Sequence, residues 1–316
     1  MTKPVAVITG IRGQDGILLG QLLIAAGFQV VGTSHAWSGT IALCEQSVEV
    51  VKVDIDDQVE IDDFIRLHRP DHLYCLAARA SSKDLNANPI EMTEINGLSC
   101  VRFLEAVRTF SPKTRLCFAS SSEVFAGSQV SPQTELTPTS PVNAYGVAKN
   151  LAMQYVRIYR EQFGIYACSA ILYNHESHLR PLHFVSKKIC TAAAKIAQGL
   201  HVELTLGDLT AQRDWGYAGD TVRALKLMLE HDKPEDYVVA TGVLHSVAQM
   251  CEIAFSHVGL QYTEHVKIAL QNDRRAEASP LRGDASKARQ LLNWMPEISF
   301  EEMIQRMVDH EMKINA

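Results

Sequence analysis

Short apolar runs rich in β-branched residues alternate with longer segments of helical periodicity over the first half of the chain. The apolar runs predict strands at Val5 to Thr9, Gln29 to Thr33, Val48 to Val53, His72 to Ala77, Arg115 to Ser120 and Tyr166 to Leu172. The segments between them predict helices at Gly16 to Ala26, Val59 to His68, Pro89 to Thr109 and Asn143 to Phe163. Apolar strands in regular alternation with helices are typical of a parallel sheet covered on both faces. The predicted fold class is therefore α/β, with a doubly wound sheet.

The pattern becomes irregular after about residue 173. An apolar helix is expected around Phe184 to Gly199, and a strand at Tyr237 to Gly242 is expected to rejoin the sheet. We therefore expect a first domain of residues 1–172, with residues 217–242 returning to it, and a smaller α/β lobe of residues 173–316. This lobe should cover the carboxyl ends of the strands, where open α/β sheets bind ligands.

Composition and charge exclude several classes of protein. The chain has 316 residues, of which 47% are hydrophobic and 21% charged, enough for one large core or two modest ones. A net charge of -6 without a basic stripe argues against nucleic acid as a partner. The seven cysteines are scattered and include no CxxC pair, so neither a disulfide framework nor a metal site is expected. No apolar stretch approaches the roughly 18 residues of a membrane span, so we expect a soluble protein. The scattered cysteines favour a reducing cytoplasm as its compartment.

A glycine-rich segment, TGIRGQDG, directly follows the first predicted strand and opens the first helix. Gly10, Gly13 and Gly16 permit a tight turn in which backbone N–H groups approach a pyrophosphate, and the helix N-terminus stabilises its charge. Gln14 and Asp15 lie in the same loop. The placement between strand and helix predicts a dinucleotide cofactor and a Rossmann-type sheet.

The end of the second strand bears on which dinucleotide is bound. A carboxylate that would bind the adenine ribose 2′-OH of NAD is missing from Gly32 to His35, and Arg12 can instead pair with a 2′-phosphate. NADP is therefore favoured over NAD, with a solvated loop residue as the alternative for Arg12. Asp54 and Ile55, after the third strand, are candidates for the adenine edge. The alternative for Asp54 is a helix N-cap.

Tyr145 and Lys149 lie one turn apart near the start of a predicted helix, in the segment NAYGVAKN. Residues at this spacing share one helix face. A neighbouring ammonium favours the phenolate, so we expect a lowered pKa for Tyr145 and proton exchange with a sugar or alcohol hydroxyl near neutral pH. Lys149 can also bind the hydroxyls of the nicotinamide ribose. For such a pair taken alone, an exposed helix face is the alternative.

The fifth predicted strand ends in the segment SSSE, which adds a hydroxyl and a carboxylate. Ser121 can donate a hydrogen bond to the oxygen that Tyr145 deprotonates. Glu123 indicates more than alcohol oxidation, because a second base is needed only where a carbon-bound proton is also removed. Its alternative is a helix-start or surface carboxylate.

Together with later segments, these motifs resemble the GDP-mannose 4,6-dehydratase family of the extended short-chain dehydrogenase/reductase superfamily. The resemblance runs through TGIRGQDG, PDHLYCLAA, SSSE, SPVNAYGVAK, ILYNHES, FVSKKI, RDWG, ATGVLHSV and GDASKA. It implies a lyase reaction in which hydride passes from C4 of a nucleotide-linked hexose to NADP while Tyr145 accepts the O4 proton. Glu123 then removes the C5 proton, water leaves from C6 and the hydride returns to C6, which gives a 4-keto-6-deoxy sugar.

The resemblance also implies roles for further residues. Ser121 is expected to polarise O4. The implied cofactor contacts are Leu76, Ala77, Ala78, His175 and Arg180. The implied contacts to the nucleotide diphosphate sugar are Asn174, Val185, Lys188, Arg213, Arg274 and Glu277, although each arginine alone could equally form a surface ion pair.

The sequence departs from the family pattern in four places. Phe125-Ala126 stands where the family has an aromatic residue and a glycine, Ser121 replaces the usual threonine, and residues 178–182 (HLRPL) replace an arginine-glycine-glutamate segment. The segment SHAWSGTIALCEQ after the second strand is shorter and lacks paired arginines. In relatives that loop helps to bind the 2′-phosphate and to join subunits, and we expect a homodimer or homotetramer here.

Three functions remain open from the sequence. The first is a dehydratase acting on GDP-mannose or a close analogue such as a GDP-heptose. The second is a 4-keto reductase or C4-epimerase of the same superfamily, which uses the serine, tyrosine and lysine without needing Glu123. The third is a non-catalytic dinucleotide sensor, for which erosion of the Tyr145 and Lys149 pair is expected, and both residues are present.

Overall fold

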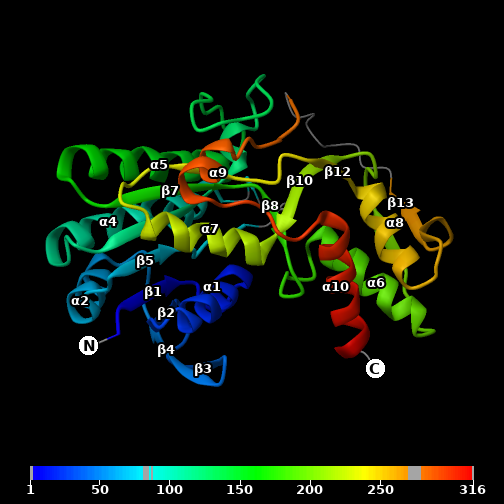
Figure 1. Cartoon of the computed structure of the whole chain (residues 1–316), viewed down its shortest axis with the longest axis horizontal. Coiled ribbons are helices and arrows are strands. Elements are labelled where there is room, and N and C mark those ends of the chain that lie inside the picture. The colour runs from blue at the N-terminus through cyan, green and yellow to red at the C-terminus, as the bar shows by residue number, and fades with distance from the viewer. Residues whose placement is uncertain (1–2, 81–84, 87, 270–278, 315–316) are drawn as a thin grey trace.

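The computed structural model describes residues 3–80, 85–86, 88–269 and 279–314. An eight-stranded sheet with the order β11-β7-β6-β5-β1-β2-β4-β3 forms its centre (Figure 1). The strands are β1 (Val5–Thr9), β2 (Gln29–Ser34), β3 (Gly39–Leu43), β4 (Gln46–Lys52), β5 (His72–Cys75), β6 (Arg115–Ser121), β7 (Ala167–Leu172) and β11 (Tyr237–Val239). All neighbouring strands are parallel except β3 and β4. The predicted α/β class with a largely parallel sheet is confirmed.

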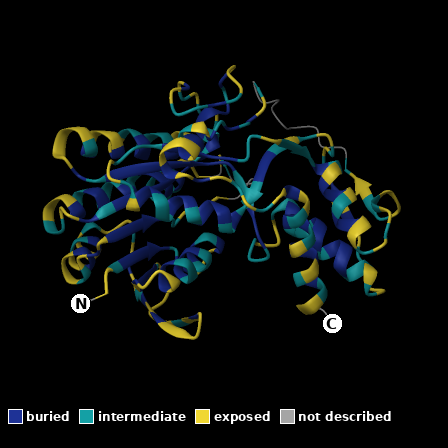
Figure 2. Cartoon of the chain, in the orientation of Figure 1, coloured by how far each residue is buried: buried dark blue, intermediate teal, exposed yellow. Residues whose placement is uncertain are grey.

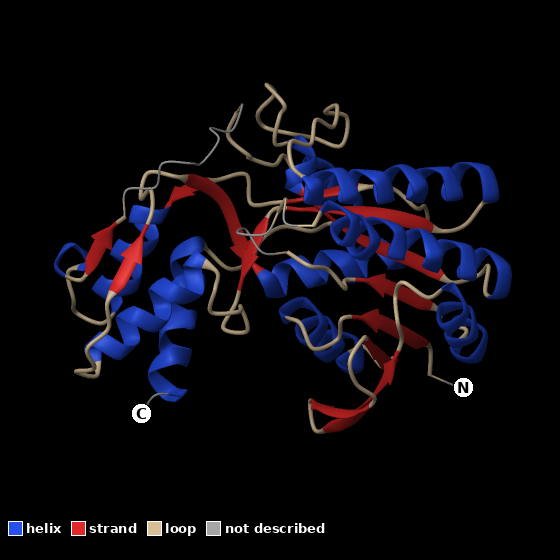
Figure 3. Cartoon of the chain, turned by 180° about the vertical axis from the view of Figure 1, so that it is seen from behind, coloured by secondary structure: helices blue, strands red, loops and turns tan. Residues whose placement is uncertain are grey.

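Helices cover both faces of this sheet (Figures 1 and 3). One face packs against α1 (Gln14–Ala25), α7 (Ala218–Glu230) and α9 (Ser286–Leu292), and the other against α2 (Gln58–His68), α4 (Ser99–Phe110) and α5 (Ala144–Phe163). Strand β1 shows why its sequence is apolar throughout: Ala6 and Ile8 enter one core and Val7 enters the other, all fully buried. The strands accordingly form the dark, buried centre in Figure 2.

The C-terminal part has a core of its own. Strands β8 (Asn174–Glu176), β10 (Gln212–Tyr217) and β12 (Leu244–Ser246) form a small sheet, and β9 (Leu204–Leu206) pairs with β13 (Val266–Ile268). Helices α6 (Val185–Ala197), α8 (Val247–His257) and α10 (Phe300–Ile314) pack with Trp215 around this core, beside the short helix η3 (Tyr262–Glu264). The boundary at residue 172 stays a prediction. No helix in the described part of the chain combines the length and apolarity of a bilayer span.

The helix expected at Pro89 to Thr109 has a π-helical segment inside it. It consists of α3 (Pro89–Thr93), the π segment η1 (Glu94–Leu98) and α4. Buried Asn96 uses this extra turn to accept a hydrogen bond from Arg79 N at 3.0 Å, so it holds the loop that follows β5. A Cβ on Gly97 would lie 3.0 Å from Ala148 O, which shows how closely α5 approaches. Apolar periodicity alone does not reveal such an insertion.

Strand β3 is an antiparallel edge strand that the sequence analysis did not predict. It forms a hairpin with β4 in which Leu43 pairs with Gln46, and Cys44 and Glu45 form the two-residue turn. Both turn residues have positive φ, 47° and 62°. Such turns normally use asparagine and glycine, so the Cys-Glu pair carried no turn signal.

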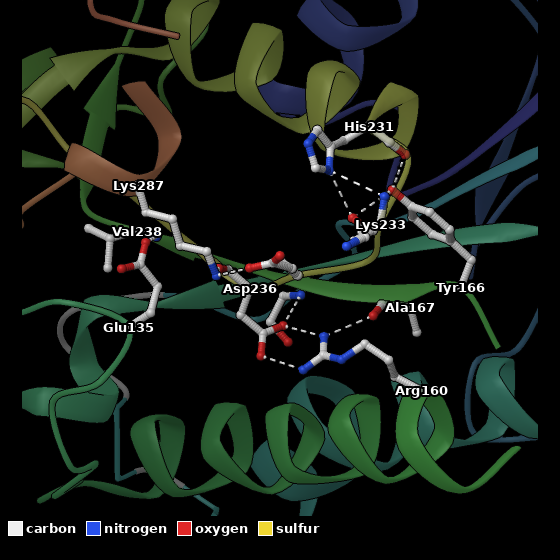
Figure 4. A network of polar contacts seen from close by, with 11 residues as sticks. Glu135, Arg160, Tyr166, Ala167, His231, Lys233, Asp236, Val238 and Lys287 are labelled. Atoms are coloured by element: carbon white, nitrogen blue, oxygen red, sulfur yellow. Dashed lines mark hydrogen bonds and ion pairs between the residues drawn. The ribbon is translucent and has the colours of Figure 1, made fainter. Parts of the chain in front are cut away.

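The edge strand β11 is fixed to the sheet by polar contacts around Asp236 (Figure 4). The carboxylate of Asp236 accepts two hydrogen bonds from the Arg160 guanidinium, both at 3.0 Å, and one from Ser169 N at 2.7 Å. The hydroxyl of Tyr166 donates to His231 O at 2.6 Å. These contacts tie the segment between α7 and β11 to α5 and β7, so the returning strand is anchored by side chains as well as by its ladder.

Candidate functional site

The parallel register brings the predicted site residues to one edge of the sheet. Thr9 at the end of β1 is level with Cys75 at the end of β5, and Ser121 at the end of β6 is level with Leu172. The glycine loop follows β1, and the short helix η2 (Ser122–Phe125) follows β6. The carboxyl edge is where sheets of this type bind ligands.

The loops after β1 and β5 pack directly against each other. Gly10 has φ of 69°, and a Cβ at this position would lie 3.0 Å from Ala77 Cα. A Cβ on Gly16 would lie 2.6 Å from Gly10 O, so the tight turn also excludes a side chain there. The Oγ1 of Thr9 accepts hydrogen bonds from Leu76 N and Ala77 N, each at 2.9 Å. Thr9 thus orients two predicted cofactor contacts, a role that the sequence did not signal.

The N-terminus of α1 has the features of an anion site. Its N-cap is Gly13, which supplies no side-chain hydrogen bond, whereas the N-termini of α2 and α5 are capped by Asp57 and Asn143. Backbone N–H groups in the first helical turn have no partner within the helix, and the helix dipole favours negative charge there. The glycine loop therefore fits the pyrophosphate of a dinucleotide.

Gln14, Asp15 and His175 form a buried polar cluster at the start of α1. His175 Nε2 lies 2.9 Å from Asp15 Oδ2, and Gln14 Nε2 donates to Asp15 Oδ1 and to His175 O, both at 3.1 Å. Burial disfavours both charges, but the attraction between the two side chains outweighs it. The pKa of Asp15 is lowered and that of His175 is raised. The ion pair joins the glycine loop to β8.

Arg180 lies next to this cluster. Its Nε is 2.9 Å from Glu176 Oε2, and its guanidinium carbon is 3.5 Å from the ring centre of Phe184. Its charge opposes the rise of the Tyr145 pKa and contributes to the lowered pKa of Asp15. The altered segment after β8 therefore still brings an arginine to the site.

The four predicted catalytic residues come together between β6 and α5. Tyr145, in the first turn of α5, is buried and hydrogen-bonded to Ser121, and Glu123 acts on its electrostatics. Lys149 is 1% exposed, and its Nζ donates to Ala119 O at 2.7 Å. The same Nζ lies 5.7 Å from the ring centre of Tyr145.

The expected lowering of the Tyr145 pKa is wrong for this structure. Burial raises the pKa of Tyr145 to about 12, the negative charge of Glu123 adds to the rise, and the hydrogen bond with Ser121 opposes it. Burial also lowers the pKa of Lys149 to about 8. The i, i+4 spacing of Tyr145 and Lys149 shows that they share a helix face. It does not show that this face is buried or that the Lys149 ammonium donates a hydrogen bond to Ala119 O.

Asn143 is a site residue that the sequence analysis did not select. Its Oδ1 accepts a hydrogen bond from Gly146 N at 2.8 Å and caps α5, while its Nδ2 donates to Glu123 Oε2 at 2.7 Å. A Cβ on Gly146 would lie 2.7 Å from Glu123 O. An asparagine directly before a predicted helix is a recognisable N-cap, but its second bond depends on the fold.

The predicted adenine contacts lie around the ends of β2 and β4. Arg12 is exposed, and its guanidinium carbon is 5.5 Å from the ring centre of Trp37. The alternative interpretation of Asp54 as a helix cap is wrong, because Asp57 caps α2. Asp54 instead accepts a hydrogen bond from Asp56 N at 3.0 Å. Ile55 packs against the core, and Ala78 is exposed.

The predicted substrate contacts lie on the neighbouring C-terminal elements. Asn174 on β8 is level with Trp215 on β10, the strand that also carries Arg213. The guanidinium of Arg213 donates to Gln212 O at 2.7 Å. Val185 and Lys188, both partly buried, lie in the first turn of α6. The other two, Arg274 and Glu277, lie outside the described residues.

Two further features concern the surroundings of the site. Within the described ranges, no group of three histidine, cysteine, aspartate or glutamate side chains is placed to hold a metal ion. A groove of about 790 Å³ in the C-terminal part has a lining that includes Trp215, His245, Glu252, Phe300 and Glu301. It shares no residue with the catalytic cluster, so we assign it no part in the reaction.

Comparisons with known proteins match one family model over most of the chain. Residues 7–307 match the family model described as GDP-mannose 4,6 dehydratase. GDP-mannose 4,6 dehydratase 1 of Arabidopsis thaliana is 36% identical over 99% of this chain and 91% of its own length. The GDP-mannose 4,6-dehydratase of Vibrio cholerae is 35% identical over 99% and 95%.

Solved structures show the same fold at lower identity. The UDP-glucose 4-epimerase of Thermotoga maritima superposes with a TM-score of 0.87 at 23% identity, over 99% of this chain and 100% of its own. The dTDP-glucose 4,6-dehydratase of Bacillus anthracis gives 0.82 at 18% identity, over 98% and 97%. At these identities the likeness concerns the fold alone.

Proposed function

This chain belongs to the GDP-mannose 4,6-dehydratase family and is therefore a nucleotide-sugar 4,6-dehydratase, a hydro-lyase, and we propose that it acts on GDP-mannose with NADP as cofactor. The observation that carries the proposal is the presence of a buried phenol and a partly buried carboxylate in one site. Tyr145 and Glu123 interact electrostatically beside Ser121. A reaction that breaks both an O–H and a C–H bond needs two such groups.

The glycine loop is the proposed cofactor site. The uncapped N-terminus of α1 and the close approach of Gly10 to Ala77 support it, because both leave backbone rather than side chains at the surface for a pyrophosphate. NADP, when bound, supplies a ring that takes up and returns a hydride and a positive charge that favours the phenolate of Tyr145. Gln14, Asp15 and His175 hold the loop in place through their shared hydrogen bonds.

The proposed proton transfers follow from the positions of the four catalytic residues. Tyr145 takes the proton from O4 of the sugar, and Ser121, its hydrogen-bond partner, polarises the same oxygen. Lys149 binds ribose hydroxyls and adds positive charge beside the phenol. Glu123 removes the C5 proton once C4 is a ketone, and Asn143 holds the carboxylate in position at 2.7 Å. Water then leaves from C6, and a double bond forms between C5 and C6. Return of the hydride to C6 and addition of a proton at C5 then give the 4-keto-6-deoxy sugar.

The nucleotide part of the substrate is proposed to bind the C-terminal elements. Asn174 and Arg213 lie on the adjacent strands β8 and β10, and Lys188 lies in the first turn of α6. The N-terminus of α6 carries no side-chain cap, which suits a diphosphate. Val185, Arg274 and Glu277 are proposed to complete the site. A GDP-heptose is the alternative substrate, since the altered segment at residues 178–182 borders this site.

Compartment and assembly are also proposals. All seven cysteines are free, including two close pairs, Cys75 with Cys100 and Cys117 with Cys168, which supports a reducing cytoplasm. Helix α5 exposes apolar side chains at helical spacing, supporting self-association as a homodimer or homotetramer. The exposed residues are Val147, Tyr155 and Ile158.

Incubation with GDP-mannose and no added reductant tests this proposal. Mass spectrometry is expected to show a product one water lighter than the substrate, and NMR a 4-keto-6-deoxy sugar. No product from GDP-mannose, but turnover of a 4-keto sugar with NADPH, would contradict the dehydratase and favour a reductase. A panel of GDP-, UDP-, dTDP- and CDP-sugars identifies the preferred nucleotide.

The role of Glu123 has its own test. Glu123→Gln is expected to abolish exchange of the C5 proton with deuterated solvent while leaving NADP binding intact. Glu203→Gln, at an exposed position, is the matched control and should exchange at the wild-type rate. Unchanged exchange in Glu123→Gln would remove this residue from its assigned role.

A further inference from the structure

Trp37 and Arg12 form an exposed pair beside the predicted adenine end of the cofactor site. The guanidinium carbon of Arg12 lies 5.5 Å from the centre of the indole ring, within the range of a cation–π contact. Trp37 is 37% exposed, whereas Trp215 and Trp294 are buried. A large aromatic side chain thus lies on a surface loop in cation–π contact with an arginine of the glycine loop.

The loop that carries Trp37 is held at both ends. Ser34 O accepts a hydrogen bond from Val53 N at 3.0 Å, and Ser38 Oγ accepts one from Lys52 N at 2.7 Å. The indole also lies close against Gly39, where a Cβ would come within 2.3 Å of the ring. Trp37 is therefore placed by its surroundings and does not depend on a ligand for its position.

The end of β2 is linked to the glycine loop by a backbone hydrogen bond from Gly10 N to Thr33 O at 3.2 Å. Arg12 and Trp37 extend from these two joined segments. Residues 34–38 have the sequence SHAWS and so offer no carboxylate to compete for the guanidinium. A guanidinium stacked on an aromatic face keeps its N–H groups directed outward in the plane of its fork, the arrangement that binds phosphate with two hydrogen bonds.

We propose that Trp37 is a positioning residue that holds Arg12 for the 2′-phosphate of NADP, and that the pair sets the preference for NADP over NAD in this chain. The inference rests on the proposed function, because it assumes a dinucleotide in the glycine loop. The indole contributes by restricting the long arginine side chain before binding, which reduces the conformational entropy lost when the phosphate is bound.

Calorimetric titration with 2′,5′-ADP and with 5′-ADP tests the inference without catalysis. Trp37→Ala is expected to weaken binding of 2′,5′-ADP about fivefold, the effect of one exposed cation–π contact, and to leave 5′-ADP within about twofold. Trp37→Phe should retain most of the affinity because it keeps an aromatic face. Gly39→Ala, which pushes the ring from its place without removing it, should resemble Trp37→Ala.

A double-mutant cycle separates positioning from direct contact. If Trp37 acts through Arg12, the Arg12→Ala variant and the Arg12→Ala/Trp37→Ala variant bind 2′,5′-ADP equally weakly. Additive losses, or equal losses for 2′,5′-ADP and 5′-ADP in Trp37→Ala, would overturn the inference and place the indole on the adenine ring. A wild-type chain that binds neither probe would instead contradict the proposed function.

Fluorescence gives a second readout. Because Trp37 is the exposed one of the three tryptophans, 2′,5′-ADP is expected to change the emission of the wild-type chain and to leave that of Trp37→Phe unchanged. An equal change in both proteins would show that the signal comes from a buried tryptophan, and would contradict a phosphate site at the Arg12–Trp37 pair.

Discussion

Replacing Lys149 by methionine tests whether the buried ammonium of the catalytic cluster destabilises the fold. The side chain is 1% exposed, and burial lowers its pKa from 10.5 to about 8. At about 1.36 kcal/mol per pKa unit, the charged form in the folded chain is disfavoured by about 3 kcal/mol at neutral pH. Methionine has a similar shape and no charge.

The expected gain is smaller than that figure because two contacts are lost. The hydrogen bond from Lys149 Nζ to Ala119 O contributes about 1 kcal/mol, and the contact with the Phe118 ring, at 4.7 Å, about 1 kcal/mol. Lys149→Met is therefore expected to have a free energy of unfolding about 1 kcal/mol above that of the wild type at pH 7, while losing activity.

The pH dependence gives the sign of the effect independently. Below pH 8 Lys149 is protonated in both the folded and the unfolded chain, and the penalty is constant. Between pH 8 and pH 10.5 the unfolded chain holds more protons, so the wild-type free energy of unfolding rises with pH. Lys149→Met lacks this term. Its advantage over the wild type is thus expected to shrink by about 1 kcal/mol between pH 7 and pH 9.

Urea unfolding followed by circular dichroism at pH 7, 8 and 9 measures both quantities. Other titrating groups, including the buried thiols, are present in both proteins, so their contributions to the free energy of unfolding cancel in the difference between Lys149→Met and the wild type. Lys113→Met, at an exposed position, is the control and should track the wild type at every pH. The reasoning is refuted if Lys149→Met is clearly less stable than the wild type at pH 7, or if the difference stays constant from pH 7 to pH 9.

Three further predictions concern the site and its scaffold. Tyr145→Phe is expected to lower the rate of product formation by about 10²–10⁴-fold with a wild-type melting temperature, and a loss below tenfold would exclude the phenol as base. Asn143→Ala is expected to lower the free energy of unfolding by about 1 kcal/mol, because the N-cap of α5 is lost. Asn143→Ser should lower it by less than half of that, since serine also caps helices. Equal losses for the two variants in urea titrations would contradict the capping role. Arg160→Ala, which removes both hydrogen bonds to Asp236, is expected to lower the free energy of unfolding by about 2 kcal/mol. A change within 0.5 kcal/mol, about the range of an ordinary surface substitution, would show that these two hydrogen bonds do not anchor β11.

Much of the fold could be predicted from the sequence because local and tertiary preferences agree. The strand at Val5–Thr9 has the predicted bounds, since its apolar residues face two cores and Gly10 directly ends it. Disagreement arises where tertiary contacts override local pattern. The π segment at Glu94–Leu98 lies where α5 approaches closely, at Gly97. The hairpin turn at Cys44 and Glu45 uses residue types that seldom adopt positive φ.

The candidate site shows a similar division. Ser121, Glu123, Tyr145 and Lys149 could be found by spacing, because each lies at a strand end or in a helix start that sequence patterns mark. The pKa shifts of Tyr145 and Lys149 could not be predicted from spacing. Burial is their main cause, and burial is a property of the folded chain. Polar contacts between residues far apart in the sequence, such as that between Asp15 and His175, could not be predicted from the sequence either.

In the proposed reaction, a hydride removed from C4 of the hexose is returned to C6 of the same molecule. GDP-mannose carrying deuterium at C4 tests it most directly, with the position of the label in the product read by NMR and mass spectrometry. We expect the deuterium to appear at C6 and solvent hydrogen to enter at C5. Deuterium retained at C4, or released to solvent with none at C6, would contradict it.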